Sequence, residues 1–415
     1  MSHVRCLEGL SSGAEYPADA VMNTCPVDGR PVAIRYDLDA LRSDRPVPPW
    51  YHPDRSDLWR FGGLLPLDIA DPNDERHVVS LGAGATPRLD YPEHPAAQRG
   101  SFRLQIKDEG RYPPEGNPTG SFKDRGMAMV VSMARRLGVE RLAVPTQGNA
   151  GDALAEYGVA ANLDVGIGMP RSTDLPILGK VAAYNKTEDN VSLTVVDGTI
   201  REAGDAVQST YLENGFFNVA TFQEPGWRIE GKKTMGLELA EPNAPSGPWS
   251  LPDVIVYPTG GGTGIVGMWK AFEELDALGL IGPERPRMVS VQTTETAPIV
   301  DAFQRGDADT TPVEPGETIA TGLNVAEGIG HFRVLEILYE SDGHAISVSD
   351  PSIASALQRT YHEKGWWMCP EGAACLAALN PLVDRNVIQA GDDVVVFNTA
   401  SLEKYLPNTR HLLEK

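Results

Sequence analysis

The stretch DVIVYPTGGGTGIVGMWKAFEEL, residues 253–275, contains the strongest fold signal in this chain. The β-branched run at 253–258 is typical of a buried parallel strand, and the segment 263–278 has the apolar period of a helix. A strand, a turn and a helix in this order form the repeating unit of an α/β fold. The turn consists almost entirely of glycine and threonine, and includes Gly260, Gly261, Gly262, Thr263 and Gly264.

The same alternation runs outward from this unit along most of the chain. Short apolar runs predict strands, and longer periodic segments between them predict helices. Repeated alternation predicts a doubly wound α/β architecture with right-handed crossovers. The predicted strands are 102–107, 141–145, 163–170, 191–197, 253–258, 287–292 and 393–398, and the predicted helices are 121–138, 150–162, 228–240, 263–278 and 350–364.

The first 45 residues differ from the rest and carry two cysteines, Cys6 and Cys25. A zinc ribbon requires paired cysteines at close spacing, but the positions three residues further on are Gly9 and Asp28. We therefore expect no metal site here, and predict a small hairpin-rich appendage. The proline-rich stretch at 45–49 marks its boundary.

The composition excludes several classes of function. The 415 residues carry 36 Lys and Arg against 57 Asp and Glu, a formal net charge of -21. Such a surface repels phosphate backbones and anionic lipid heads, so we expect neither a nucleic-acid nor a membrane partner. No apolar run approaches the roughly 20 residues that span a bilayer, and no secretory signal core is present. With only four cysteines, a cytoplasmic protein with free thiols is expected.

The glycine-rich turn at 260–264 has a chemical meaning as well as a structural one. Backbone N–H groups of such a turn, together with the start of the following helix, form a cradle for a phosphate. The spacing is neither that of a P-loop nor that of a dinucleotide fingerprint. A run of glycines at the end of a strand costs conformational entropy, so a flexible turn without a ligand is the weaker interpretation.

A second motif, NPTGSFKDRG at 117–126, places Lys123 in the first turn of the predicted helix, with Ser121 as its expected N-cap. The positive potential of a helix start favours the neutral amine, which is the form that attacks an aldehyde. A solvated surface lysine paired with Asp124 is the ordinary alternative.

Two further turns follow predicted strands. PTQGNAGDAL at 145–154 opens a helix with small residues, which suits a substrate carboxylate, and Asn149 offers an amide to a phenolic oxygen. FNTASLEKY at 397–405 follows the last strand and offers a hydroxyl, from Thr399 or Ser401, to a heterocycle nitrogen. Each turn alone is unremarkable, but the four motifs together supply what a pyridoxal-phosphate (PLP) site requires.

With these motifs the sequence resembles the fold-type II PLP enzymes, and most closely threonine synthase and its relatives. The motif at 117–125 is similar to their lysine motif almost letter for letter, and the likeness covers most of residues 55–405. The resemblance implies two doubly wound three-layer α/β domains with the cofactor in the cleft between them. It implies a degenerate ribbon at 1–45, a large PLP-binding domain at 46–80 plus 226–415, and a smaller catalytic domain at 81–225 that carries the lysine.

The resemblance also implies roles for individual residues. Lys123 forms the imine (Schiff base) with PLP, Asn149 contacts the ring oxygen, and Thr399 or Ser401 contacts the pyridine nitrogen. The cofactor phosphate lies on Gly260, Gly261, Gly262, Thr263 and Gly264, and the substrate contacts Ser121, Thr146, Gln147, Gly148, Ala150 and Arg228. No metal is implied, and the family's usual homodimer is expected.

Several positions depart from the family pattern. RYPPEG at 111–116 looks inserted beside the lysine motif, and Gln147 replaces a small residue. The turn after the last strand reads Thr-Ala-Ser-Leu at 399–402 and lacks the usual glycines. In threonine synthases, polar residues before the arginine help to bind the substrate phosphate. In this chain Arg228 is retained and Lys232 is a candidate helper. Glu224, which lies in the same stretch, is expected to repel the phosphate.

The expected function is a threonine synthase-like lyase acting on a small amino acid, with γ-elimination of phosphate from O-phosphohomoserine and hydration to threonine. The alternative keeps the cofactor and changes the substrate: β-elimination or β-replacement on a Ser- or Thr-like amino acid. A non-catalytic PLP-binding protein is the third hypothesis.

Overall fold

The computed structural model describes residues 3–414 and divides into two compact units. Unit 1 contains the described residues up to Ala85 together with Asn117–Thr234, and unit 2 contains Thr86–Gly116 and the described residues from Met235 onward. Each unit has its own α/β sheet, and the chain crosses from unit 1 to unit 2 within helix α8 (Trp227–Ala240).

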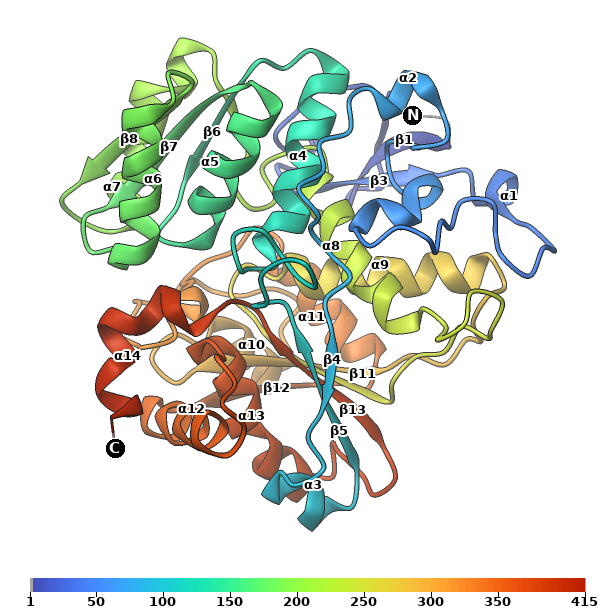
Figure 1. Cartoon of the computed structure of the whole chain (residues 1–415), viewed down its shortest axis with the longest axis vertical. Helices are drawn as coiled ribbons and strands as arrows, with labels where there is room; N and C mark the ends of the chain where they lie inside the picture. Colours follow the sequence, from blue (N-terminus) through green and yellow to red (C-terminus); the bar gives the residue numbers. More distant parts are fainter. Residues whose placement is uncertain (1–2, 415) are drawn as a thin grey trace. The chain divides into compact units, whose positions relative to one another are not determined.

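Unit 1 is built on a parallel sheet with the strand order β8-β7-β6-β9. The strands are β6 (Arg141–Pro145), β7 (Asp164–Pro170), β8 (Val191–Val196) and β9 (Phe217–Asn218) (Figure 1). Helix α4 (Lys123–Leu137) precedes them, and the helices between them are α5 (Asn149–Ala161), α6 (Leu175–Thr187), α7 (Ile200–Thr210) and η2 (Leu212–Asn214).

Helices cover both faces of this sheet. Successive side chains of a strand point to opposite faces. Val165 of β7 lies against α5, because a Cβ at Gly158 of α5 would come within 2.5 Å of it. A Cβ at Gly168, three residues along the same strand and on the other face, would come within 2.5 Å of Val207 of α7. Unit 1 is therefore a three-layer α/β unit.

The N-terminal residues of unit 1 form a separate antiparallel sheet with the order β2-β1-β3. These strands lie in the segment for which a hairpin-rich appendage is expected. Cys6 and Cys25 are buried in it as free thiols. The strands are β1 (Val4–Gly9), β2 (Glu15–Tyr16) and β3 (Val32–Tyr36), and the short helices after them are α1 (Leu38–Leu41), η1 (Leu58–Leu64) and α2 (Pro72–Glu75).

Unit 2 is built on a sheet with the order β12-β11-β10-β13-β5-β4, in which only the edge strand β4 runs antiparallel to its neighbour. Alternate residues such as Val254 and Val256 belong to one large apolar core with Leu379 of α13. The strands are β4 (Arg88–Asp90), β5 (Arg103–Asp108), β10 (Val254–Pro258), β11 (Arg287–Thr293), β12 (His344–Val348) and β13 (Asp393–Asn398).

The helices of unit 2 follow its strands along the chain. They are α3 (Pro95–Gly100), α9 (Thr263–Ala277), α10 (Pro298–Arg305), η3 (Thr321–Leu323), α11 (His331–Glu340), α12 (Asp350–Lys364), α13 (Pro370–Asp384), η4 (Leu402–Tyr405) and α14 (Leu406–Leu413).

These elements confirm the predicted α/β fold class, and every strand predicted from the sequence is present within one or two residues. The expected domain boundaries differ from the two units. The strand predicted at 102–107 was assigned to the smaller domain, but β5 pairs in parallel with β13 in the sheet of unit 2. Residues 46–80 were assigned to the large domain, but they lie in unit 1, where the Val79 N–H donates to Ser132 Oγ of α4 at 2.9 Å.

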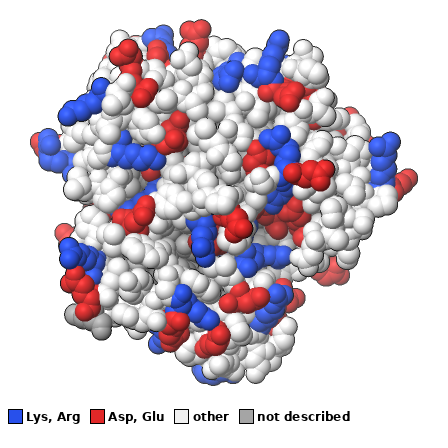
Figure 2. All heavy atoms as spheres, in the orientation of Figure 1, with Lys and Arg blue, Asp and Glu red and all other residues white. Residues whose placement is uncertain are grey.

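The charge on the surface is mixed. On the face seen in Figure 2, Lys and Arg side chains lie among Asp and Glu side chains rather than in one large patch. Among residues 3–414, no helix combines the length and the apolar character that crossing a membrane requires.

Candidate active site

Lys123 and Asn149 lie at the same edge of the sheet in unit 1. Helix α4 ends at Gly138, which adopts the left-handed conformation (φ 71°), and the chain enters β6 three residues later. Because α4 returns antiparallel to β6, the start of α4 is placed at the carboxyl edge of the sheet. Helix α5 begins at Asn149, directly after β6, and packs on α4. The carboxyl edge is where ligands bind in open α/β sheets.

The loop before Lys123 is held by buried polar contacts. Asp124 accepts hydrogen bonds from the N–H and from Oγ1 of Thr119, both at 2.8 Å. Asn117 Oδ1 accepts the Gly84 N–H at 3.2 Å. The expected N-cap, Ser121, is displaced by one residue: Phe122 occupies that position, and Ser121 Oγ accepts the Lys123 N–H at 3.4 Å. The loop fixes where helix α4 starts, and with it the position of Lys123.

Two lysine ammonium groups lie on the ring of Phe122. Lys123 Nζ is 4.2 Å and Lys232 Nζ is 4.4 Å from the ring centroid. Lys232 is fully buried and also donates to the Phe122 carbonyl oxygen. Lys232 thus contacts the loop that precedes helix α4, at the ring and the carbonyl oxygen of Phe122.

Helix α8 brings Lys232 to this place by crossing α4 at two glycines. A Cβ at Gly231 would overlap the carbonyl oxygen of Arg125, and one at Gly126 would lie 3.1 Å from Lys232 Nζ. Arg125, which is fully buried, donates from Nη1 to Thr234 Oγ1 at 2.9 Å. The crossing depends on the absence of a side chain at Gly231, where the facing atom belongs to the backbone.

The expected carboxylate loop leads directly into α5. Thr146 Oγ1 accepts the Gly148 N–H at 3.1 Å, and Gly148 is the N-cap of α5, where it supplies no side-chain acceptor. The Gly151 N–H donates to the Gly148 carbonyl at 3.1 Å, and the start of α5 has no side-chain cap, as is usual for an anion-binding helix start. Gln147 and Ala150 flank this cap and are partly exposed.

Arg228 reaches the same edge through the loop after β9. The Val219 N–H donates to the Ala143 carbonyl of β6 at 2.9 Å, which anchors the loop to the sheet. Arg228 Nη1 donates to the Val219 carbonyl at 3.0 Å. Arg228 also lies against α4, because a Cβ at Gly126 would be 3.7 Å from Arg228 Cβ. Within unit 1 the structure thus brings Lys123, the 146–150 loop and Arg228 to one edge.

In unit 2, the glycine turn and the terminal hydroxyls also share an edge. β10 and β13 are parallel neighbours, so the turn at 259–262 and the turn at 399–401 follow the carboxyl ends of adjacent strands. The Thr399 hydroxyl is buried 3.5 Å from Cys369 Sγ, and Ser401 is the buried N-cap of η4. No residue from 399 to 402 is among those with a positive φ in the described chain. The turn therefore forms without the usual glycines.

The glycine turn has the geometry of an anion cradle. Gly262 has a φ of 90° and is the N-cap of α9 without a side-chain cap. A Cβ at Gly260 would lie 2.6 Å from the Gly322 carbonyl oxygen, and one at Gly264 would overlap the hydroxyl of Tyr257. These positions admit only glycine, and the N–H groups at the start of α9 are available to a phosphate.

Comparison with known proteins identifies this arrangement. The family profile described as pyridoxal-phosphate dependent enzyme matches residues 79–400. The chain belongs to this family. It is 32% identical to a threonine synthase of Methanosarcina acetivorans over 97% of the chain and 92% of the relative. It is 29% identical to a threonine synthase of Methanocaldococcus jannaschii over 95% of the chain and 91% of the relative.

Solved structures agree with this family at the level of the fold. Threonine deaminase isoform 2 from Solanum lycopersicum matches with a TM-score of 0.63 at 20% identity, covering 83% of this chain and 90% of that chain. An L-serine ammonia-lyase from Rhizomucor miehei matches with a TM-score of 0.63 at 18% identity, covering 79% of this chain and 98% of that chain. At these identities the likeness shows the fold alone.

The residues present fit pyridoxal phosphate. A cradle of glycines that a Cβ would fill suits its phosphate, and a lysine at a helix start suits its aldehyde. Residues that could hold the cofactor are present in each unit: Lys123 and Asn149 in unit 1, and Gly260, Gly261, Gly262, Thr263, Gly264 and either Thr399 or Ser401 in unit 2.

The structure adds two residues that sequence reasoning did not place in the site. His331, expected to have an ordinary core or surface role, is buried with Nε2 3.0 Å from the Gly260 carbonyl and Nδ1 3.1 Å from Thr310 Oγ1. Burial lowers its pKa. Glu371, whose role the sequence left open, accepts the Gly322 N–H at 2.7 Å. Both residues brace the cradle of this PLP enzyme, because Gly322 in turn packs against Gly260.

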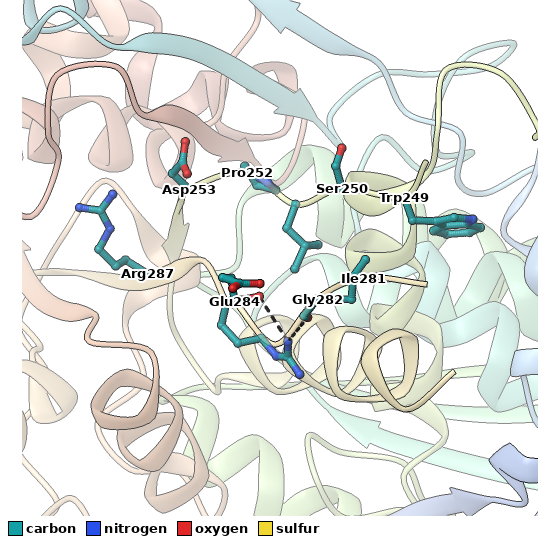
Figure 3. A pocket seen from close by; sticks show the side chains of 10 residues that line it. Trp249, Ser250, Pro252, Asp253, Ile281, Gly282, Glu284 and Arg287 are labelled. Atoms are coloured by element: carbon teal, nitrogen blue, oxygen red, sulfur yellow. Dashed lines mark hydrogen bonds between the residues drawn. The ribbon is translucent and has the colours of Figure 1, made fainter. Parts of the chain in front are cut away.

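One pocket of this enzyme lies away from the proposed site. A cavity of 270 Å³ opens beside the amino ends of β10 and β11, the edge opposite to the glycine turn (Figure 3). Its two cations are already engaged: Arg285 pairs with Asp276 at 2.6 Å, and Arg287 with Asp392 at 2.7 Å. The pocket is lined by Trp249, Ser250, Leu251, Pro252, Asp253, Ile281, Gly282, Glu284, Arg285 and Arg287.

Proposed function

We propose that this PLP-dependent enzyme is a threonine synthase, which releases phosphate from O-phosphohomoserine and adds water to form threonine. The observation that carries the proposal is the 32% identity to a threonine synthase over nearly the full length of both chains. The position of Arg228 at the same sheet edge as Lys123 supports it, because the reaction requires a cation for the leaving phosphate.

Pyridoxal phosphate, when bound, supplies an electron sink for the negative charge that forms at the substrate Cα. Lys123 holds the cofactor covalently and, once released, its Nζ takes the proton from Cα as a general base. Lys123 is thus proposed as the residue that both attaches the cofactor and moves the proton.

The substrate is oriented by the starts of helices and by Arg228. The N–H groups behind Gly148 bind its carboxylate, with Ser121, Thr146, Gln147 and Ala150 around it. Arg228 binds the phosphate that leaves. A neutral hydroxyl of Thr399 or Ser401 faces the ring nitrogen and leaves it largely unprotonated, which suits elimination more than transamination. We further propose a cytoplasmic location, which the free thiols support, and a homodimer, which the family resemblance implies.

Product analysis tests this function. Purified enzyme with PLP is incubated with O-phosphohomoserine, and phosphate and threonine are measured together. Equal amounts of both are expected. Ammonia and a 2-oxo acid from serine, threonine or diaminopropionate, without threonine formation from O-phosphohomoserine, would instead establish β-elimination. No turnover of any amino acid despite bound cofactor would point to a non-catalytic protein.

A further inference from the structure

Glu224 is a buried carboxyl group that uses only one of its two oxygens. The side chain is 1% exposed, and its Oε2 accepts the Arg228 N–H at 3.1 Å, which caps the first turn of α8. Its Oε1 is buried and has no hydrogen-bond partner among residues 3–414. A buried carboxylate oxygen without a partner carries a large desolvation penalty. Helix capping therefore explains the position of Oε2, but it gives no role to Oε1.

Arg228 shows the same pattern beside it. Its guanidinium is buried, and Nη1 donates to the Val219 carbonyl at 3.0 Å, while the Nε–H has no partner among the described residues. Glu224 and Arg228 are one helical turn apart, and Arg228 lies against α4 at Gly126, one turn beyond Lys123. The Arg228 Nε–H and Glu224 Oε1 are thus two buried polar groups without a hydrogen-bond partner at the sheet edge of the proposed site.

The surroundings favour the protonated form of Glu224. Burial raises the pKa of Glu224 to about 7, against the attraction of Arg228, and Glu230 raises it further. Lys232, a further buried cation on α8, lies against the same Gly126 of α4 as Arg228 does. Asn23, which braces the loop from the N-terminal sheet, is neutral.

We propose that Glu224 is a specificity-determining residue whose protonated Oε1 donates a hydrogen bond to the substrate phosphate held by Arg228. The inference rests on the proposed function. A neutral carboxylic acid does not repel a phosphate, as the sequence suggested Glu224 would. It adds a donor beside the Arg228 cation, and a phosphate supplies acceptors for both groups. An amino acid that lacks such an anion leaves Glu224 Oε1 and the Arg228 Nε–H without partners in a buried place, and is rejected for that reason.

The binding of an anion is then coupled to a proton. Above pH 7 most Glu224 side chains of the free enzyme are ionised, and the anion must restore the proton to bind. The affinity for an anion falls as the pH rises, by roughly tenfold between pH 6 and pH 8, because one ionisation near pH 7 controls it. Sulfate is the suitable probe, since it is a phosphate-like dianion that does not itself titrate in this range.

Calorimetric titration of the holoenzyme with sulfate at pH 8, in buffers of different ionisation enthalpy, measures the protons taken up. The wild type is expected to take up close to one proton per sulfate bound. In the E224Q variant the amide N–H₂ replaces the acid as donor, so binding persists without proton uptake. E213Q, an exposed change in η2 of the same unit, is the matched control and should behave like the wild type.

Equal proton uptake by wild type and E224Q, or the absence of sulfate binding to the wild type, would overturn the inference. Where E224Q does not fold, the pH dependence of sulfate affinity in the wild type decides, and an affinity that is constant from pH 6 to pH 8 contradicts it. Threonine formation is assayed separately. An enzyme that forms threonine without the proton coupling refutes the role of Glu224, whereas one that forms none refutes the proposed function itself.

Discussion

Gly231 of α8 lies so close to the carbonyl oxygen of Arg125 of α4 that any side chain at this position would overlap it. The contact joins the helix that begins at Lys123 to the helix that carries Arg228 and Lys232. Because the atom that faces Gly231 belongs to the backbone, no rotamer change can relieve an added methyl group. The position of the lysine relative to the arginine is thus set at one glycine.

The variant G231A is expected to lower the free energy of unfolding by more than roughly 3 kcal/mol, since the two helices must separate. Chemical denaturation measures this. The matched control is G204A in α7, where a Cβ meets no atom within 4 Å. That change should be neutral or stabilise by about 0.5–1 kcal/mol through its effect on the unfolded chain. Similar stabilities for the two variants would contradict the crossing.

G260A tests the phosphate cradle. The added Cβ would lie 2.6 Å from the Gly322 carbonyl and 2.9 Å from Val325, so the turn must shift and its N–H groups lose their alignment. We expect the dissociation constant of PLP, measured by titrating the apoenzyme, to rise at least tenfold, about 1.4 kcal/mol. An unchanged constant, with G204A again as the reference, would place the phosphate elsewhere.

N23D tests the support that the N-terminal sheet gives to the Arg228 loop. Asn23 Nδ2 donates to the carbonyls of Asn218 and Gln223 at 3.0 and 2.8 Å, and an aspartate cannot donate. Two lost hydrogen bonds correspond to roughly 1–2 kcal/mol. We expect the KM for O-phosphohomoserine to rise about fivefold or more with kcat nearly unchanged. N185D is the control, at an exposed asparagine of α6 whose Oδ1 accepts the Leu193 N–H at 2.8 Å, a contact that an aspartate keeps. A loss confined to kcat would speak against the support.

The buried His94 is expected to make unit 2 less stable at acidic pH. Burial lowers the pKa of His94 to about 4, against the effect of Glu363 and with that of Arg359. The native state keeps the imidazole neutral while the unfolded chain binds a proton near pH 6.5. The free energy of unfolding therefore falls as the pH drops from 6.5 to 4, by up to roughly 3 kcal/mol.

H94N retains an N-cap acceptor for the Ala96 N–H, which His94 Nδ1 binds at 3.3 Å, but removes the titration. Its unfolding free energy should depend less on pH over this range, as measured by denaturation at several pH values. Parallel pH profiles for H94N and the wild type would show that His94 does not control the acid limit.

The sequence was sufficient for the elements and for the local motifs. Strands such as β10 and β13 are β-branched runs buried on both faces, and the lysine and the glycine turn lie at helix starts that their own neighbours define. The pairing of strands that are far apart in the sequence could not be predicted. β5 pairs with β13, which lies almost 300 residues later, and no local pattern records that choice. The expected domain boundaries failed at this strand for that reason.

The contacts between motifs were also beyond the sequence. Lys232 reaches Phe122 only because α8 crosses α4 at two glycines, and His331 reaches Gly260 only in the folded unit. The formal charge of Glu224 predicts that it repels the substrate phosphate. Its burial, which favours the protonated form, is a property of the fold.

The central claim is that Lys123 holds the cofactor covalently. The direct measurement is borohydride reduction of the holoenzyme followed by peptide mass spectrometry, which fixes the cofactor on the lysine that carries it. The account predicts the added mass on the peptide containing Lys123, and its loss in K123A but not in K186A, an exposed change in α6. The added mass on Lys232, which lies on the same Phe122 ring, or on any other lysine of the wild type would contradict the account.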